Sequence, residues 1–201
     1  MPNFISRNYT TQNFPNGPQT IEDRILLFAD RVRGWQIDPA LRCIQHDPHA
    51  GFAVLHIVVS YFEVIGMIEF DANTHAYLMT QDGDWEGGKE FKAGLMSVLP
   101  ELANHKSNQV RWFRNDFYIK VRCGLYHQSM TRSGIFISSQ LAQANGYEFR
   151  DLGNQGCAIA INPHRLAERL SGHLTAFELR LRDPLNQKLR QRFDDVFQKL
   201  Q

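Results

Sequence analysis

The segment at residues 117–129 reads Phe117-Tyr118-Ile119-Lys120-Val121-Arg122-Cys123-Gly124-Leu125-Tyr126-His127-Gln128-Ser129. It closes a pattern in which apolar residues recur at helical spacing: Val110, Phe113, Phe117, Val121 and Leu125. Arg122 lies at the edge of this apolar stripe, and His127 follows it after four intervening residues. The pattern predicts an amphipathic helix with a charged group at the margin of its buried face.

Gly124 decides whether Arg122 and His127 lie side by side. An α-helix turns about 100° per residue, so two residues five positions apart point about 140° away from each other. The pair therefore converges only if the helix stops or bends between them. Glycine permits a stop because it adopts the left-handed conformation that ends many helices. We expect the helix to run to about Arg122, to loosen around Gly124, and to bring His127 round beside Arg122.

An arginine beside a histidine suits cleavage of a phosphodiester bond without a metal. Histidine titrates near neutral pH and can accept a proton from a ribose hydroxyl. Arginine stays charged and binds phosphate oxygens, so it stabilises the charge of a transition state. The alternative is a helix end with one capping arginine and one ordinary polar histidine. Residue types alone favour this alternative, since such a pair arises easily by chance.

The wider segments 51–70 and 108–137 resemble the HEPN superfamily (higher eukaryotes and prokaryotes nucleotide-binding domains). Arg122 and His127 match its signature of an arginine and a histidine separated by four to six residues. The resemblance implies an all-helical core, RNA cleavage in toxin–antitoxin or phage-defence systems, and dimers in which the motifs of two protomers face one cleft. The family commonly has Asn, Asp or His where this chain has Cys123. One toxin branch has a tyrosine at the position of Ser129.

Residues 51–69 predict a central core helix, because they are apolar on nearly every side. Its exceptions, His56, Ser60 and Glu63, are spaced four and three apart and share one face. They either form a structural polar network or line a cleft, and the sequence leaves both open. The segment contains no Lys or Arg. A carboxylate withdrawn from water needs a partner, so we expect Glu63 to pair with Arg122 of the neighbouring helix.

Composition describes a globular chain. Its 201 residues are 43% hydrophobic and 21% charged, which fits one domain spanning residues 1–201. A net charge of +1 excludes a global basic field, so any RNA contact has to be local. Three widely spaced cysteines suit free thiols. Residues 51–70 are long enough to span a bilayer, but His56 and Glu63 oppose that. We expect a cytoplasmic protein with no membrane, metal or cofactor.

The remaining pattern predicts a mainly α fold, a HEPN-like helical bundle with a small β-hairpin or three-strand insert after the motif helix. The insert covers about 134–161, with strand-like runs at 134–138, 147–150 and 157–161. Helices are expected at 20–34, from Asp38-Pro39 through Ile44, at 51–69, around 91–102, and from Asn108, Asn162-Pro163 and Asp183-Pro184.

Two hypotheses for function follow. The first is a metal-independent endoribonuclease of a toxin or defence system that acts as a homodimer and leaves a cyclic phosphate end. The second is a non-catalytic HEPN-like module that binds a nucleotide, RNA or a partner protein. An antitoxin or regulatory protein is a further expected partner. In the first, the predicted catalytic residues are Arg122, His127 and Glu63, and the predicted substrate-binding residues are Ser60, His56, Tyr126 and Gln128.

Overall fold

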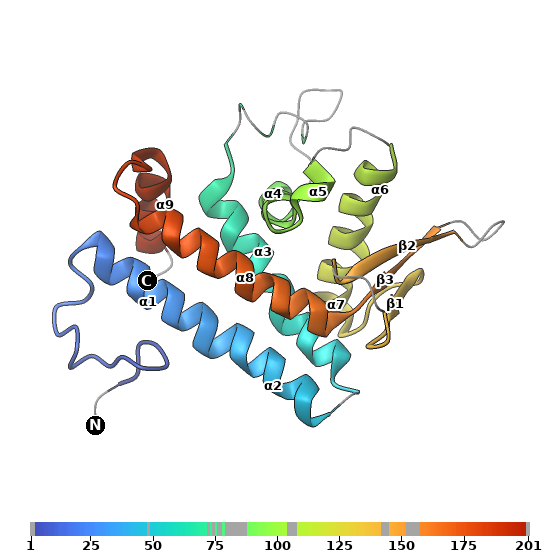
Figure 1. Cartoon of the computed structure of the whole chain (residues 1–201), viewed down its shortest axis with the longest axis horizontal. Coiled ribbons are helices and arrows are strands. Elements are labelled where there is room, and N and C mark those ends of the chain that lie inside the picture. The colour runs from blue at the N-terminus through green and yellow to red at the C-terminus, as the bar shows by residue number, and fades with distance from the viewer. Residues whose placement is uncertain are drawn as a thin grey trace.

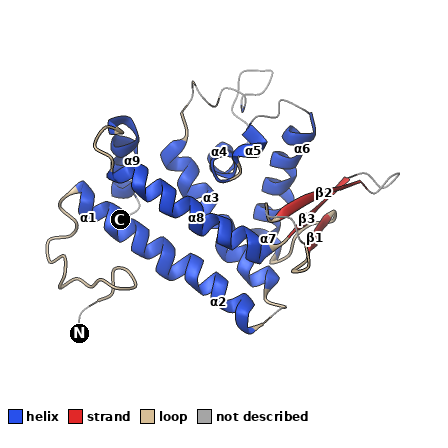
Figure 2. Ribbon diagram, viewed as in Figure 1, coloured by secondary structure: helices blue, strands red, loops and turns tan. Residues whose placement is uncertain are grey.

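The structure, a computed structural model, describes residues 3–47, 49–71, 73, 75, 78, 88–103, 108–141, 145–151 and 157–199. These residues are mainly helical, and a small three-stranded sheet lies at one end of the helical body (Figure 1, Figure 2). The predicted fold class, mainly α with a small β insert, is confirmed.

The elements have the following bounds: α1 Ile21–Val32, π-helical η1 Arg33–Ile37, α2 Asp38–His46, α3 Gly51–Glu69, α4 Lys89–Val98, α5 Pro100–Ala103, α6 Asn108–Asp116, π-helical η3 Phe117–Arg122, α7 Cys123–Gln128, β1 Ile135–Ile137, β2 Tyr147–Asp151, β3 Cys157–Ile161, α8 Pro163–Arg182 and α9 Gln187–Lys199.

Elements α1, η1 and α2 form one uninterrupted helical rod, so the predicted break before Asp38 is wrong. The backbone of Asp38 is right-handed helical and its side chain caps nothing; its carboxylate instead binds Arg7 at 2.6 Å. Proline in a helix lacks an N–H and clashes with the carbonyl four residues back. The wider π-helical turn, in which the Asp38 N–H reaches back to the carbonyl of Arg33, accommodates Pro39.

Helix α3 is the centre of the fold, and its bounds are those predicted. It packs against α2, α4, α8 and α9 and also contacts η3. Its buried residues include Val54, Leu55, Val58, Phe62 and Ile65, which are at most 1% exposed. Neighbouring helices therefore cover α3 on several sides, which explains why its sequence is apolar on nearly every side.

Two glycines let α3 and α4 touch backbone to backbone. A Cβ on Gly66 would lie 1.6 Å from the carbonyl oxygen of Glu90, and one on Gly94 would lie 1.8 Å from that of Phe62. Neither distance is physically possible, and both obstacles are main-chain atoms that cannot turn aside. The crossing of α3 and α4 therefore requires glycine at both positions.

The motif helix runs without a break from α6 through η3 to α7. The buried face includes Phe113, Phe117, Val121 and Leu125, as predicted, while Val110 lies outside the residues whose side chains are described. The helix does loosen, but in the π-helical turn before Gly124, where the Cys123 N–H donates to the carbonyl of Tyr118. It ends at Ser129, which has a positive φ of 55°.

Gly124 lies inside the helix for a reason that differs from the predicted one. A Cβ there would lie 2.7 Å from the carbonyl oxygen of Met130, because the chain folds back across the helix after Ser129. The Arg132 N–H donates to the carbonyl of Lys120 at 3.0 Å and holds this return. Glycine is therefore required for a close approach and not for a helix end.

The insert is a three-stranded sheet in the order β1-β3-β2, with β1 parallel and β2 antiparallel to β3. The Phe113 ring of α6 lies 4.9 Å from the rings of both Tyr147 and Phe149, which anchors β2 to the helical body. The buried Asn162 then starts α8: its Oδ1 accepts from the Arg165 N–H, and its Nδ2 donates to the carbonyl of Leu141 at 2.9 Å.

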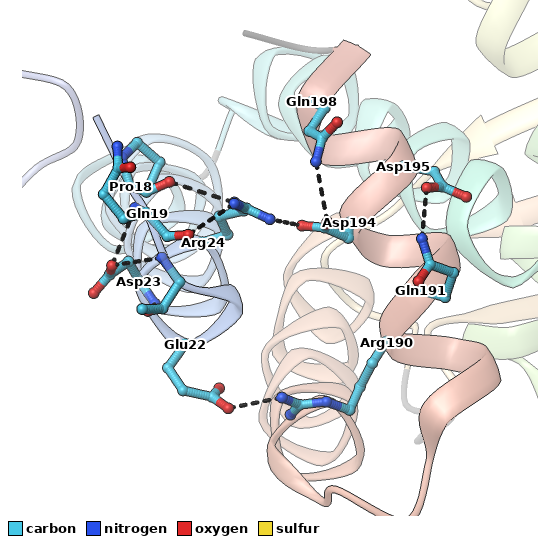
Figure 3. Close-up of polar contacts among 11 residues, drawn as sticks. Pro18, Gln19, Glu22, Asp23, Arg24, Arg190, Gln191, Asp194, Asp195 and Gln198 are labelled. Atoms are coloured by element: carbon cyan, nitrogen blue, oxygen red, sulfur yellow. Dashed lines mark hydrogen bonds and ion pairs between the residues drawn. The ribbon is translucent and has the colours of Figure 1, made fainter. Parts of the chain in front are cut away.

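Polar contacts fasten α9 to the start of α1 (Figure 3). Arg190 binds the carboxylate of Glu22 at 2.7 Å, and Arg24 pairs with Asp194. Arg24 also donates to the carbonyl of Gln19 at 2.9 Å, just before the N-cap. The predicted final helix thus forms, but it begins at Gln187, after the turn at Asp183.

We predict that G66A and G94A each lower the free energy of unfolding by roughly 3 kcal/mol or more, because the added methyl overlaps main-chain atoms. Gly172, in the exposed face of α8, is the matched control, since a Cβ there meets nothing within 4 Å. G172A should raise the free energy of unfolding by about 0.5–1 kcal/mol. Urea denaturation measures all three; equal effects at the three positions would contradict the backbone contact.

Candidate functional site

The predicted pair between Glu63 and Arg122 is confirmed. Nη2 of Arg122 donates to both carboxylate oxygens of Glu63, at 2.8 and 3.1 Å. Glu63 comes from the face of α3 that turns toward η3, and Arg122 is the last residue of η3. The Glu63 side chain is 40% exposed and that of Arg122 is 21% exposed, so the pair lies at the protein surface and contacts water.

Arg122 is also the middle of an aromatic stack. Its guanidinium carbon lies 4.8 Å from the ring centre of Tyr126 and 6.0 Å from that of Tyr118, one turn away on either side. The ring of His56, from α3, stacks on Tyr126 at 4.9 Å with an angle of 27° between the planes. Four flat groups from two helices therefore lie in a row, in the order Tyr118, Arg122, Tyr126 and His56, and Glu63 binds the guanidinium.

The order of these contacts follows from the helix directions. Glu63 lies opposite Arg122, while His56, two turns earlier in α3, lies opposite Tyr126, which is later in its own helix. The helices therefore run in opposite directions along the site. His56 and Tyr126 were predicted to bind substrate, and the structure brings both together with Arg122 and Glu63.

His127 does not join this cluster. The helix continues through Gly124, so the residue that lies over Arg122 is the one four positions later, Tyr126. His127, five positions later on an α-helical segment, points about 140° away. Its side chain is exposed and makes no hydrogen bond or ion pair within the part of the chain that the structure describes. The predicted convergence of His127 on Arg122 is therefore wrong, because Gly124 does not end the helix.

Ser60 and Gln128 also remain outside the cluster. The Ser60 hydroxyl donates to the carbonyl of Ile57 in its own helix at 2.8 Å, an ordinary way for a serine in a helix to be satisfied. Gln128 is exposed at the end of α7. The polar stripe on α3 therefore divides: His56 and Glu63 contact the motif helix, and Ser60 between them bonds its own backbone.

Tyr118 is a site residue that we did not predict. Burial raises the pKa of Tyr118, and the neighbouring Cys123 raises it further; Nζ of Lys92 lies 5.7 Å from the centre of the Tyr118 ring. The hydrogen bonds to Glu63 raise the pKa of Arg122, so this cation stays charged. Its Nε is buried without a hydrogen-bond partner in the described structure. The spacing of Tyr118, Arg122 and Tyr126 by four was the signal in the sequence.

Two further observations concern metal binding and the length of α3 relative to a membrane. Among the described residues, no group of three or more His, Cys, Asp and Glu side chains is placed to hold a metal ion. Helix α3 is long and apolar enough to cross a membrane by length and composition, with a mean hydropathy of 1.9, and half of that stretch is buried in the fold. A core helix has the same properties, and α3 packs as one.

A second polar cluster lies inside the helical body. Both ring nitrogens of His173, on α8, are engaged: Nδ1 with the hydroxyl of Tyr61 at 2.8 Å and Nε2 with that of Ser97 at 3.0 Å. Tyr61 is fully buried, and burial raises its pKa. Burial lowers the pKa of His173 to about 4, against a smaller opposing effect of Glu69. This cluster joins α3, α4 and α8.

Comparison with protein-family models, with curated proteins and with solved structures finds no match to this chain.

We predict that E63Q lowers the free energy of unfolding by about 1 kcal/mol or less, because a pair that contacts water contributes little. A buried pair would cost roughly 3–5 kcal/mol when broken. Thermal or urea unfolding of E63Q beside the parent protein distinguishes these values. A loss of several kcal/mol would mean that Glu63 is withdrawn from water in solution.

We also predict a loss of stability in acid that depends on His173. Below pH ~6.5 the unfolded chain protonates this histidine, while the folded protein does not until about pH 4. The folded state therefore loses roughly 2–3 kcal/mol between pH 6.5 and 4. Urea unfolding at pH 7 and 4.5 should show this loss in the parent and in H46Q, whose histidine is exposed, and a smaller loss in H173Q. An equal loss in H173Q would contradict the prediction.

Proposed function

We propose that the Arg122 surface binds RNA and cleaves it without a metal, as in the endoribonucleases of toxin or defence systems. The observation that carries this proposal is the stack of His56, Tyr126 and Arg122, held by Glu63 at the protein surface. Flat aromatic and guanidinium faces beside a fixed positive charge are the groups that bind unpaired nucleotides.

In the proposed reaction, a ribose 2′-hydroxyl attacks the adjacent phosphorus while His127 accepts its proton. The bond from phosphorus to the 5′-oxygen breaks, water supplies the proton that this oxygen takes up, and a 2′,3′-cyclic phosphate and a 5′-hydroxyl end remain. Arg122 binds the phosphate oxygens and stabilises the charge that builds there. Glu63 orients the guanidinium through Nη2. His127 points away from the Arg122 of its own protomer, so the proton acceptor at a given phosphate is the exposed His127 of a second protomer that faces the same RNA.

Local charge supports a homodimer in this proposal. The net charge of the chain is +1, and Glu63 already offsets much of the field of Arg122. A second protomer that faced the same RNA would bring a second Arg122 and His127 to one phosphate. An antitoxin or other regulatory protein would then act by covering this surface.

One observation favours a second candidate, a non-catalytic module that binds a nucleotide, RNA or a partner protein. Both described hydrogen bonds of Arg122 Nη2 go to Glu63, and His127 makes no described hydrogen bond or ion pair with either residue. Binding by the aromatic stack needs no acid–base group. The two candidates therefore differ in the role of His127 and not in the role of Tyr126.

We predict that the protein cleaves total cellular RNA in the presence of a chelator. Removing an acid–base group costs about 10²–10⁴-fold in rate, so H127A should be at least a hundredfold slower. H46A, an exposed histidine on α2, is the matched control and should cleave at the parental rate. The rate is followed by gel electrophoresis, and the 2′,3′-cyclic end by mass spectrometry.

The outcomes separate the two candidates. RNA binding that depends on Arg122 without any cleavage supports the second candidate. Cleavage by H127A at the parental rate excludes His127 as the proton acceptor. If the protein neither binds nor cleaves RNA, RNA is excluded as the ligand of this surface.

A further inference from the structure

A cavity of about 330 Å³ opens beside the first turn of α3, where β1 and the start of α8 meet it. The half-exposed ring of Phe52, 44% accessible, forms one wall. The side chains of His49, Ser138, Ser139 and Gln140 supply polar groups around it. Gly51 also lines it and lets β1 pack closely against the start of α3, because a Cβ there would lie 2.8 Å from the Ile137 side chain.

The cavity lies on the same line of α3 as the aromatic stack. Phe52 and His56 are four residues apart and both exposed, so they are neighbours on one helix face. Four residues span about 6 Å along a helix axis. The rise of a stacked nucleic-acid strand is about 3.4 Å per nucleotide, so this distance is that of roughly two nucleotides. A single strand bound over Tyr126 and His56 therefore reaches Phe52 within about two nucleotides.

The lining chemistry suits a base and its ribose better than a phosphate. Among the described residues that line the cavity, none is Lys or Arg. An aromatic ring offers a stacking face, and an amide such as Gln140 can both donate to and accept from the edge of a base. Gln140 is exposed, and only its main-chain N–H has a described partner, the Ser138 hydroxyl at 3.3 Å. A volume of this size is at the lower end of ligand cavities, as a single nucleotide requires.

We infer that this cavity is a second nucleotide subsite, which receives an unpaired base of the same RNA strand about two nucleotides from the base stacked on His56 and Tyr126. The inference rests on the proposed function, since it takes RNA as the ligand of the Arg122 surface. It adds the substrate class: the RNA is single-stranded over several nucleotides, because a base must leave any duplex to stack on Phe52 and present its edge to Gln140. A hairpin stem is therefore excluded from the cavity.

The test is binding of fluorescein-labelled 2′-O-methyl oligonucleotides of A and of U, which cannot be cleaved because the 2′-oxygen is blocked. Fluorescence anisotropy gives the Kd for an octanucleotide and, by competition, for a dinucleotide. F52A should raise the Kd of the octanucleotide about tenfold, since loss of one base-stacking face has an effect of this order. Q140A should raise it severalfold. Both should leave the Kd of the dinucleotide unchanged, whereas R122Q should weaken both ligands.

F136A is the matched control for F52A. Phe136, on β1, is also 44% exposed but does not line the cavity, so its loss should leave both Kd values unchanged. Thermal unfolding checks that F52A folds. If F52A does not fold, the Kd values of Q140A test the subsite, because Gln140 is exposed and its replacement leaves the fold intact.

Each outcome is decisive for one proposal or both. Octanucleotide binding that needs Arg122 but is unchanged in F52A and Q140A overturns the subsite and leaves the proposed function standing. Equal losses for the octanucleotide and the dinucleotide in F52A also overturn it, because Phe52 would then act through the Arg122 site. An octanucleotide that does not bind the parent protein overturns the proposed function, and with it the subsite.

Discussion

The structure depends on the contact between the backbones of α3 and α4 at Gly66 and Gly94. Two helices that meet without side chains between them have their rotation and register fixed together, because main-chain atoms cannot adjust as side chains do. Glu63 lies less than one turn before Gly66, so the helix crossing also fixes the position of Glu63 on α3. The position of its carboxylate beside Arg122 is then set by the helix crossing and by the contact of α3 with η3, and a surface ion pair worth little by itself is held in one place.

The stack around Arg122 shows how a nearly neutral chain builds a local site for an anion or a base. Tyr118 and Tyr126 limit the guanidinium on two sides, and Glu63 fixes its third. An arginine so confined loses little freedom when a ligand binds, which is the usual route from a few contacts to useful affinity. The Glu63 carboxylate also weakens the attraction of Arg122 for a phosphate. The guanidinium is therefore well oriented but attracts an anion less strongly than a free arginine would.

Periodicity and simple electrostatics predicted much of this arrangement, and tertiary contacts explain the rest. The apolar spacing predicted the bounds of α3 and the start of the motif helix, though not its end, and the absence of Lys or Arg in α3 predicted that Glu63 pairs with Arg122. Gly124 was misinterpreted because a close approach by the returning chain at Met130 leaves no local signature that differs from a helix end. Pro39 suggested a break that the π-helical turn removes. The cluster of His173, Tyr61 and Ser97 joins three distant segments, and no spacing in the sequence foretells it.

The π-helical turn from Phe117 to Arg122 has a consequence for how this chain tolerates change in length. A π-helical turn holds one residue more than an α-helix needs, so it amounts to an insertion absorbed within a helix. A chain lacking one residue here would close an ordinary α-helical turn, and the residues after it would keep their faces, because the wider turn had absorbed the extra residue. Leu125 would stay in the core and Tyr126 would stay beside His56. The same deletion in the α-helical turns before or after it would rotate everything that follows by about 100°. The segment from Phe117 to Arg122 is therefore the part of the motif helix in which a change in length by one residue leaves the aromatic surface in place.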